Sequence, residues 1–421
     1  MNADSHLSAA PEPVAVPHPY RWGVLGGVWL AYFCFGMTTV TMAPLVGVIG
    51  ADLGLSHARM GTVLGAWQLV YIASALPCGI LLDRIGPRRA LFLALMAIAA
   101  SGAFRAAAVG HLSLFLAVAI FGIGGPMISV GAPKLISLWF DGRERGLAMG
   151  IYITGPAIGN MTALSLTNSV MIPAFDGDWR MVLLSYAAVV LMAGLAWLAV
   201  TAHPAYRAAE GRLAAEPREP QIQAFGRLLR VPAVRVVLVM SVGIFFFNHG
   251  LNNWLPEILR SGGMDAATAG FWAAVPTAVG VASSLVVPRL ATPPRRLTVL
   301  LGLFVAAALA TVLLHGTQGP ILAGGLVLQG VARGAMMTVA VLTLLEIPEV
   351  GSRRAGLAGG LFFSAAEVGG VMGPVSIGLL SSAAGGFDWA LAVLTAICVA
   401  LIGMLALMRR VTTARRIENR N

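Results

Sequence analysis

The sequence predicts an all-α membrane protein in which twelve transmembrane helices form two pseudo-symmetric six-helix bundles. Composition is the first observation behind this prediction. Apolar residues make up 58% of the 421 residues and charged residues only 11%, whereas soluble chains carry about 25% charged residues. The second observation is that apolar stretches of about 20 residues, long enough to cross a bilayer as helices, recur along the chain. The net charge of +10 does not indicate a nucleic-acid partner, because most of the arginines lie between these stretches.

The predicted spans follow one another with a single long interruption. Their approximate limits are 22–49, 60–82, 90–109, 113–138, 147–172, 181–201, 233–256, 267–287, 297–314, 319–344, 356–380 and 388–408. A polar linker at 202–232 divides the chain into an N-terminal bundle at 21–201 and a C-terminal bundle at 233–408. Residues 1–20 are predicted to be a disordered tail and 409–421 a basic cytoplasmic tail. The first of these tails lacks the basic segment and cleavage site of a secretory signal, so we expect the first span to remain in place.

The basic residues are distributed unevenly about the spans. The segment before the first span, the even-numbered connections and the C-terminal tail hold 22 of them, counting Arg235 at the start of the seventh span with the linker, whereas the odd-numbered connections hold 3. Loops rich in Arg and Lys stay on the cytoplasmic side of a membrane. We therefore expect both termini in the cytoplasm and a multi-pass protein of the bacterial cytoplasmic (inner) membrane.

The connection between the second and third spans carries the most specific motif, at residues 79–89 (GILLDRIGPRR). It resembles the signature loop between helices 2 and 3 of the major facilitator superfamily, G-x-L-x-D-R-x-G-R-K. Pro87 and Arg88 stand where Arg and Lys are usual. The resemblance covers nearly the whole chain after residue 20. It implies the major facilitator fold and a transporter that works by alternating access, with its substrate site near the midplane between the halves.

The same resemblance implies a mechanical role for this loop. In the family, an acid and arginines at the ends of helices 2 and 3 latch the two halves together in the outward-open state. On this sequence the gate consists of Asp83, Arg84, Arg88 and Arg89.

Glycine-rich motifs indicate close helix packing and an internal repeat. Residues 155–160 (GPAIGN) resemble the superfamily's G-P-x-x-G-G motif of many antiporters, with Asn160 in the place of the final glycine. We interpret this motif as a helix-packing element and not as evidence for antiport. Residues 146–150 (GLAMG) recur as 356–360 (GLAGG), each after an arginine-bearing loop. This repeat supports two halves of the same build.

Two ionisable residues lie deep within C-terminal spans, where a charge is costly and therefore a candidate for function. At ~1.5 Å per residue, Arg333 falls roughly 22 Å into the tenth span and Glu367 roughly 16 Å into the eleventh. One interpretation is a buried ion pair that holds these helices in register. The other is that Arg333 binds an anionic substrate through its bidentate guanidinium while Glu367 exchanges a proton. Gln329, four residues before Arg333, would extend the same polar face.

The seventh span contains the densest polar cluster, formed by Asn248, His249, Asn252 and Asn253. On a helix that lines the cavity, as helix 7 does in the family, these side chains would bind a polar solute, and His249 could titrate near neutral pH. The alternative is a helix end, at which polar residues cap a helix that Pro256 terminates.

The N-terminal half offers weaker candidates. Gln68, Tyr71 and Tyr152 are candidates for the wall of the substrate cavity. Arg105 and Lys134 are cations near opposite ends of their spans. Each could attract an anion, or could extend its side chain to the lipid headgroups.

At finer grain the chain resembles the branch of the superfamily that contains cyanate and nitroimidazole porters. The segments that carry this resemblance are 102–106 (GAFRA), 131–134 (GAPK) and 249–256 (HGLNNWLP). The implied function is a secondary active transporter of a small anionic or polar organic solute. Proton coupling is inferred from Glu367, the only carboxylate near the midplane.

Other functions are less consistent with the sequence. A proton-coupled exporter of lipophilic drugs is expected to carry an acid within spans 1–6, and none lies there. A transporter-like membrane sensor would need a soluble output domain, but the longest connection has about 31 residues. No metal-ligand spacing, nucleophile motif or Walker loop is present, so we expect no enzyme, cofactor or metal. The expected partners are a small-molecule substrate and the lipid bilayer, with the protein acting as a monomer.

Overall fold

The computed structural model describes residues 19–140, 142–206, 226, 228–316, 319–350 and 355–418. Within that part of the chain every regular element is a helix, which confirms the predicted fold class. Most of the predicted N-terminal tail and most of the linker lie outside the described residues.

The described helices fall into two groups, one from each half of the chain. The N-terminal half consists of α1 (Arg21–Val40), η1 (Ala43–Leu45), α2 (Val46–Asp52), α3 (His57–Ala106), α4 (His111–Trp139), α5 (Gly142–Tyr152), α6 (Thr154–Leu166), η2 (Thr167–Met171), α7 (Ile172–Ala174) and α8 (Trp179–Ala202). The C-terminal half consists of α11 (Pro232–Ser261), α12 (Ala266–Leu290), α13 (Arg296–Leu313), α14 (Gly319–Leu345), α15 (Ala355–Ala384) and α16 (Asp388–Glu418). The predicted basic tail at 409–421 is therefore helical as far as Glu418.

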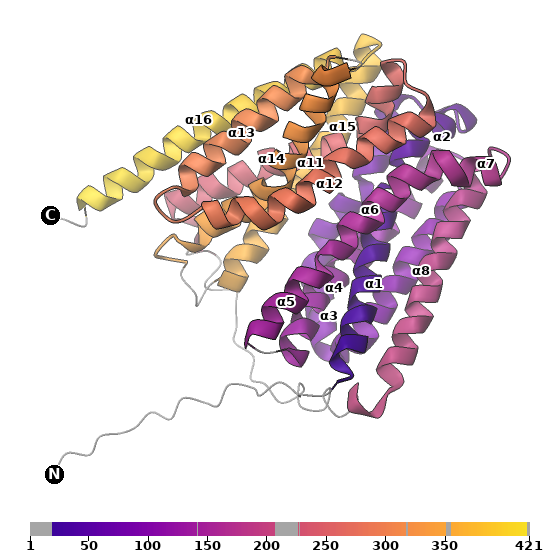
Figure 1. Ribbon diagram of the computed structural model, residues 1–421, viewed down its shortest axis with the longest axis horizontal. Coiled ribbons are helices and arrows are strands. Elements are labelled where there is room, and N and C mark those ends of the chain that lie inside the picture. The colour runs from indigo at the N-terminus through magenta and orange to yellow at the C-terminus, as the bar shows by residue number, and fades with distance from the viewer. Residues whose placement is uncertain are drawn as a thin grey trace.

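Ten segments of the described chain are long and apolar enough to cross a membrane. The two remaining predicted crossings, 60–82 and 147–172, correspond to the first part of α3 and to the succession of α5, α6, η2 and α7. Figure 1 shows α5, α6 and α7 following one another along the length of the N-terminal half. The fifth crossing is thus present but interrupted.

The connection between the second and third crossings is much shorter than the loop predicted at 79–89. α3 is 50 residues long, and its dihedral angles leave the helical region only at Gly86, where φ is 81°. Glycine adopts this left-handed conformation without a steric penalty. A single glycine, followed by Pro87, is therefore enough to change the direction of the chain between two helices.

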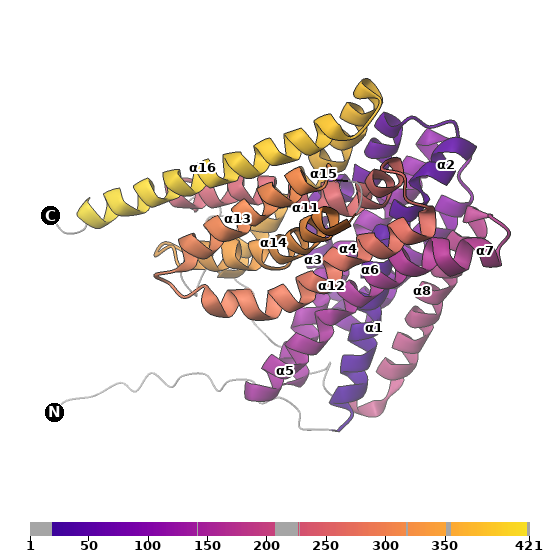
Figure 2. The same cartoon turned by 45° about the horizontal axis from the view of Figure 1, so that its top comes forward.

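The two halves meet at one end of the molecule and diverge at the other. Figure 1 shows them side by side at the end that carries α2 and α7, and apart toward the end that carries α5 and the last turns of α16. Figure 2 shows the same divergence from a second direction. We call these the closed end and the open end. The contacts between the halves are made mainly by α3 with α15 and by α6 with α12.

Hydrogen bonds between the halves secure the closed end on both sides. On one side, Nδ1 of His57 lies 2.8 Å from Oγ of Ser381. On the other, the side-chain amide of Asn168 donates to the carbonyl of Ala266 at 3.2 Å. Both contacts would have to break for this end to open.

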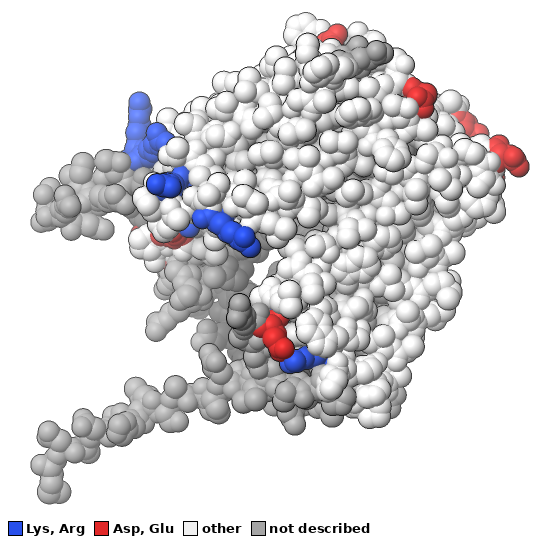
Figure 3. Space-filling model, viewed as in Figure 1, with Lys and Arg blue, Asp and Glu red and all other residues white. Residues whose placement is uncertain are grey.

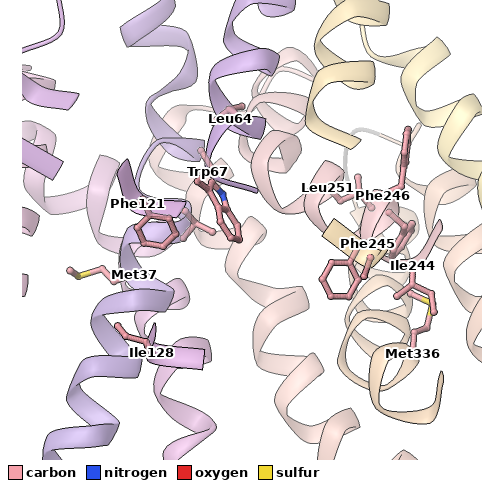
Figure 4. Close-up of a cluster of buried hydrophobic side chains, with 14 of the residues drawn as sticks. Met37, Leu64, Trp67, Phe121, Ile128, Ile244, Phe245, Phe246, Leu251 and Met336 are labelled. Atoms are coloured by element: carbon pink, nitrogen blue, oxygen red, sulfur yellow. The ribbon is translucent and has the colours of Figure 1, made fainter. Parts of the chain in front are cut away.

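The buried hydrophobic side chains form one core that continues through both halves, and Figure 4 shows part of it as an N-terminal and a C-terminal cluster. Met37 and Phe121 belong to the N-terminal cluster, and Ile244 and Met336 to the C-terminal one; all four are buried. Trp67 lies on the side of its cluster that faces the other half (Figure 4).

The glycine-rich motif of the fifth crossing packs helices together, as predicted. A Cβ on Gly155 or Gly159 of α6 would run into the backbone of α1, in the latter case at the carbonyl of Phe33. In the C-terminal half, Gly373 of α15 lies in the same way against the carbonyl of Phe246 on α11. Each half therefore contains one closely packed pair of helices, α1 with α6 in the N-terminal half and α11 with α15 in the C-terminal half.

Charged side chains differ between the two ends. On the face shown in Figure 3, lysines and arginines gather at the open end, whereas most acidic side chains lie at the closed end. This distribution matches the uneven placement of arginines along the sequence.

Candidate functional site

The guanidinium of Arg333 is one hydrogen bond away from the contact between the two halves. Arg333 is half-buried on α14, and its Nη1 donates a hydrogen bond to Oγ1 of Thr277 on α12 at 2.9 Å. Arg333 forms no ion pair within the described residues. The interpretation of a structural pair with Glu367 is therefore wrong for this conformation. The physical reason is that α15, which carries Glu367, packs mainly on α11 and α3 and has few contacts with α14.

A chain of hydrogen bonds continues from Thr277 into the other half. The hydroxyl of Thr277 donates to Oδ1 of Asn160 at 3.1 Å. The amide nitrogen of Asn160, on α6, donates to Oδ1 of Asn252 on α11 at 3.4 Å. Asn252, predicted as a substrate ligand, is thus engaged between the halves.

Glu367 lies in a second polar cluster at the boundary between the halves and is 5% exposed. A Cβ built on Gly370 would lie 2.5 Å from Oε2 of Glu367, 3.2 Å from Cγ of Gln68 and 3.4 Å from Cδ2 of His249. The glycine at 370 therefore leaves the space in which these three side chains meet. Oε2 of Glu367 and Oε1 of Gln68 have no hydrogen-bond partner among the described residues. The cluster has buried acceptors and lacks a donor for them.

His249 links this cluster to the N-terminal half. Its Nδ1 lies 3.4 Å from the amide nitrogen of Gln68, and its ring meets the Trp67 ring edge-on with 5.6 Å between centroids. Oδ1 of the neighbouring Asn248 is buried and without a hydrogen-bond partner in the described chain. These residues, predicted from the sequence as ligands, are brought together by the fold.

The polar cluster of the seventh span is not a helix end. α11 continues through Pro256 to Ser261, so the alternative of a helix terminated by this proline is wrong. Neighbouring groups in a membrane bundle can satisfy the carbonyl that a proline leaves free. The side-chain amide of Asn253 donates to the carbonyl of His249 at 2.8 Å, so this hydrogen bond stays within α11.

Tyrosines of the N-terminal half form a third polar group. Tyr152 is buried and meets the ring of Tyr32 edge-on, with 5.1 Å between centroids. The ring of Tyr71 meets the ring of Trp67 edge-on, with 6.1 Å between centroids. Tyr71 and Tyr152 were predicted from the sequence. Tyr32 was not, because one tyrosine in an apolar span gives no indication of its neighbours.

Arg105 does not extend to the lipid headgroups, and that interpretation is wrong. Its side chain is 2% exposed, and Nη1 donates to the carbonyl of Thr38 at 3.3 Å and to Oγ1 of Thr41 at 3.4 Å. The guanidinium also lies over the ring of Phe121, 5.6 Å from its centroid. Because α1 ends at Val40, the Thr38 carbonyl belongs to the negative end of a helix dipole, which stabilises a cation.

The loop predicted to act as a gate makes its described contacts inside the N-terminal half. Nε of Arg88 donates to Oγ1 of Thr201 on α8 at 3.1 Å. Arg84 and Arg89 are exposed at the open end, and the side chain of Asp83 lies outside the described part of the structure. Because the halves are apart at this end, the latch stays a prediction for the opposite conformation.

Two further predicted residues differ in their surroundings. Gln329 is buried on α14, and its Oε1 has no hydrogen-bond partner in the described part of the chain. Lys134 is half-buried on α4 toward the open end. Thr277 was missed by the sequence analysis. The available signal was a hydroxyl directly after Pro276 in the middle of an apolar span, where a polar group needs a partner.

An open apolar groove of about 610 Å³ is lined by residues of α3 and α4. Its wall includes Leu69, Ala73 and Pro77 of α3 with Ile123 and Met127 of α4. The described residues contain no group of three or more His, Cys, Asp and Glu side chains that could hold a metal ion.

Comparison with known proteins identifies relatives over most of the chain. The family model described as Major Facilitator Superfamily matches residues 28–349. An uncharacterised transporter of Bacillus subtilis, YycB, is 26% identical over 383 residues, covering 87% of this chain and 89% of the relative. The D-galactonate transporter of Escherichia coli O6:H1 is 24% identical over 440 residues, covering 97% and 99%. The probable sulfoacetate transporter SauU of Cupriavidus necator is 25% identical over 396 residues, covering 87% and 89%.

A solved structure supports the fold. The crystal structure of a bacterial homologue of the human lysosomal transporter Spinster, in an inward-facing and unoccupied conformation, matches with a TM-score of 0.76. The two sequences are 18% identical, and the match covers 94% of this chain and 98% of the other.

Proposed function

Because this chain belongs to the Major Facilitator Superfamily and is a membrane transporter, we propose that it moves a small organic anion by alternating access, with Arg333 as the group that binds the anion. The state of Arg333 is the observation that carries this proposal. One guanidinium nitrogen is bonded to a neutral hydroxyl, and no carboxylate pairs with the side chain within the described residues. A cation at membrane depth needs a compensating charge. A carboxylate or sulfonate on the substrate supplies it in bidentate geometry.

The names of relatives agree with an anionic substrate. D-Galactonate and sulfoacetate, named for two of them, are each a small organic acid. The finer resemblance to cyanate and nitroimidazole porters stays a prediction from the sequence. The amides and tyrosine hydroxyls near Arg333 and in the N-terminal half would serve the uncharged part of such a substrate.

Proton coupling at Glu367 is supported by the unpaired acceptors around it. Oε2 of Glu367 and Oε1 of Gln68 both lack a donor among the described residues. Protonation of the carboxyl would turn one of its oxygens into an O–H donor. A proton would therefore bind at the boundary between the halves, where its presence affects their contact.

The orientation follows from the arginines. If the basic open end faces the cytoplasm of a bacterial inner membrane, as the positive-inside rule requires, this conformation is open to the inside and both termini are cytoplasmic. One chain forms both halves and the candidate site at their boundary, so we propose that a monomer is sufficient for transport.

The test is thermal stabilisation of the purified full-length protein by D-galactonate, sulfoacetate, nitrate and a set of lipophilic cations. We expect an anion to stabilise the native protein and Arg333→Gln to lose at least 90% of the shift. Arg295→Gln removes an equal charge from the exposed open end and should retain it. Stabilisation by anions that is equal in all three proteins would contradict the role of Arg333.

A second candidate function is export of lipophilic compounds, which the open apolar groove along α3 and α4 favours. The same assay separates the two. Stabilisation by lipophilic cations that persists in Arg333→Gln would support an exporter and contradict the proposal of an anion carrier.

A further inference from the structure

Asn160 is the one residue of the N-terminal half in the hydrogen-bonded chain that leads to Arg333. Its amide nitrogen and its amide oxygen both bond across the boundary, to Asn252 and to Thr277. Asn160 and Thr277 are each 5% exposed and Asn252 is 8% exposed, so water does not replace these bonds readily. The side chain therefore joins α6 to two helices of the other half.

These bonds belong to the closed end. Beyond Asn160 on the same helix pair, a Cβ on Gly270 of α12 would overlap the carbonyl of Leu164 on α6. Separation of the halves at this point therefore requires α6 to move away from α12. Opening of the closed end must therefore break both bonds of Asn160.

The hydroxyl of Thr277 connects this contact to the candidate anion site. It has one proton, which it donates to Asn160 at 3.1 Å, and it accepts a proton from Nη1 of Arg333 at 2.9 Å. A hydroxyl that accepts a hydrogen bond from a cation becomes a stronger donor. The charge of Arg333 thus strengthens the bond between the halves.

We infer that Asn160 and Thr277 are positioning residues through which occupancy of Arg333 controls the closed end, an inference that rests on the proposed anion site. In the empty protein the guanidinium is held by Thr277 and reinforces the contact with Asn160. An anion that takes both guanidinium nitrogens withdraws Nη1 from Thr277. The contact is then weaker, and the halves separate more easily at the closed end. Substrate bound from the open end thereby promotes its own passage.

The first test needs no substrate. Spin labels on Ala51→Cys and Ala383→Cys, both exposed at the closed end, report the separation of the halves by pulsed electron resonance. The native cysteines Cys34, Cys78 and Cys398 are buried and stay in place. A hydrogen bond of this kind changes a two-state ratio about fivefold.

We expect Thr277→Val, which keeps the shape of the side chain, to raise the ratio of separated to closed molecules about fivefold. Asn160→Ala, which loses two bonds, should raise it about tenfold or more. Thr277→Ser keeps the hydroxyl and should remain closed. Ser283→Ala is the matched control, because Ser283 joins α12 to the Val331 carbonyl of α14 without crossing the boundary.

Arg333→Gln supplies the decisive comparison. If the arginine acts through Thr277, the double variant Thr277→Val/Arg333→Gln should be no more separated than Thr277→Val alone. Additive effects of the two changes would overturn the inference. A ratio in Asn160→Ala equal to that of Ser283→Ala would also overturn it.

The substrate arm separates failure of this inference from failure of the proposed function. D-Galactonate and sulfoacetate are added at saturating concentration to the labelled protein and to Thr277→Val. We expect the active anion to lengthen the distance in the first protein, with little further change in the second. If neither anion stabilises the protein or moves the labels, the anion site fails, while the comparison of Thr277 and Arg333 variants still decides the coupling.

Discussion

The side-chain amide nitrogen of Gln68 lies 3.4 Å from Nδ1 of His249, across the boundary between the two halves. The carboxylate of Glu367 is in the same cluster and has an oxygen without a donor among the described residues. A group that gains and loses a proton at this boundary would affect how the halves meet.

Replacing Glu367 by glutamine should uncouple transport from protons. The amide is permanently neutral and imitates the protonated carboxyl, so proton-driven accumulation should fall to background while exchange of substrate across the membrane continues. Proteoliposomes with an imposed pH gradient measure the first property and counterflow measures the second. Asp388→Asn, at an exposed site of the closed end, is the control. Accumulation at the native level in Glu367→Gln would show that this carboxylate is structural.

A methyl group on Gly370 should impair this cluster without unfolding the protein. The Cβ of Gly370→Ala would lie 2.5 Å from Oε2 of Glu367, which is the flexible end of a side chain and can move. We expect a change of less than about 1 kcal/mol in stability. Coupled uptake should fall at least tenfold. A Cβ on Gly360 of the same helix would meet open space, so Gly360→Ala should transport normally. Equal activity of the two variants would contradict the role of the space beside Gly370.

Loss of the Arg105 side chain should destabilise the N-terminal half. Arg105→Gln removes the charged donor from the end of α1 and the cation from the face of Phe121, at an expected cost of about 1–3 kcal/mol. Thermal unfolding in detergent measures the difference. Arg59→Gln changes an exposed arginine on the same helix and should be nearly neutral. If the two variants unfold at the same temperature, Arg105 is not a helix cap.

A side chain at position 159 should force α6 away from α1. Its Cβ would overlap the carbonyl of Phe33, and backbone in a packed core has little room to move. We expect Gly159→Ala to cost about 1–3 kcal/mol. Gly150→Ala lies on the neighbouring α5 with open space around it, and should be neutral or slightly stabilising. The comparison uses the yield of monodisperse protein and its unfolding temperature.

The limits of the crossings could be predicted closely from the sequence. The predicted spans 181–201 and 319–344 became α8 (Trp179–Ala202) and α14 (Gly319–Leu345). Hydrocarbon requires a continuous apolar helix of fixed length, so composition alone marks where such a helix begins and ends. The breaks at Gly86 and between α5 and α6 were less visible, because an irregular residue is tolerated wherever protein covers it.

The partners of the buried charges were not predictable in the same way. Arg333 and Glu367 were expected at similar depths on consecutive spans, yet Arg333 bonds to Thr277 on α12, whereas Oε2 of Glu367 has no partner among the described residues. Arg105 was expected near a membrane surface, but the break after Val40 gives it a buried helix end to cap.

The sequence by itself determined the all-helical fold, the limits of the long apolar helices and the position of each ionisable residue along its helix. These properties depend on position along a helix axis, which residue counting measures. Only the tertiary structure decided that Arg333 is held by Thr277, that Asn160 joins the halves and that Gln68 meets Glu367 and His249. Such contacts depend on how each helix is rotated and which neighbour it packs against. Small residues such as Gly159 and Gly370 set this rotation and packing, because they allow helices that are distant in the sequence to come into contact.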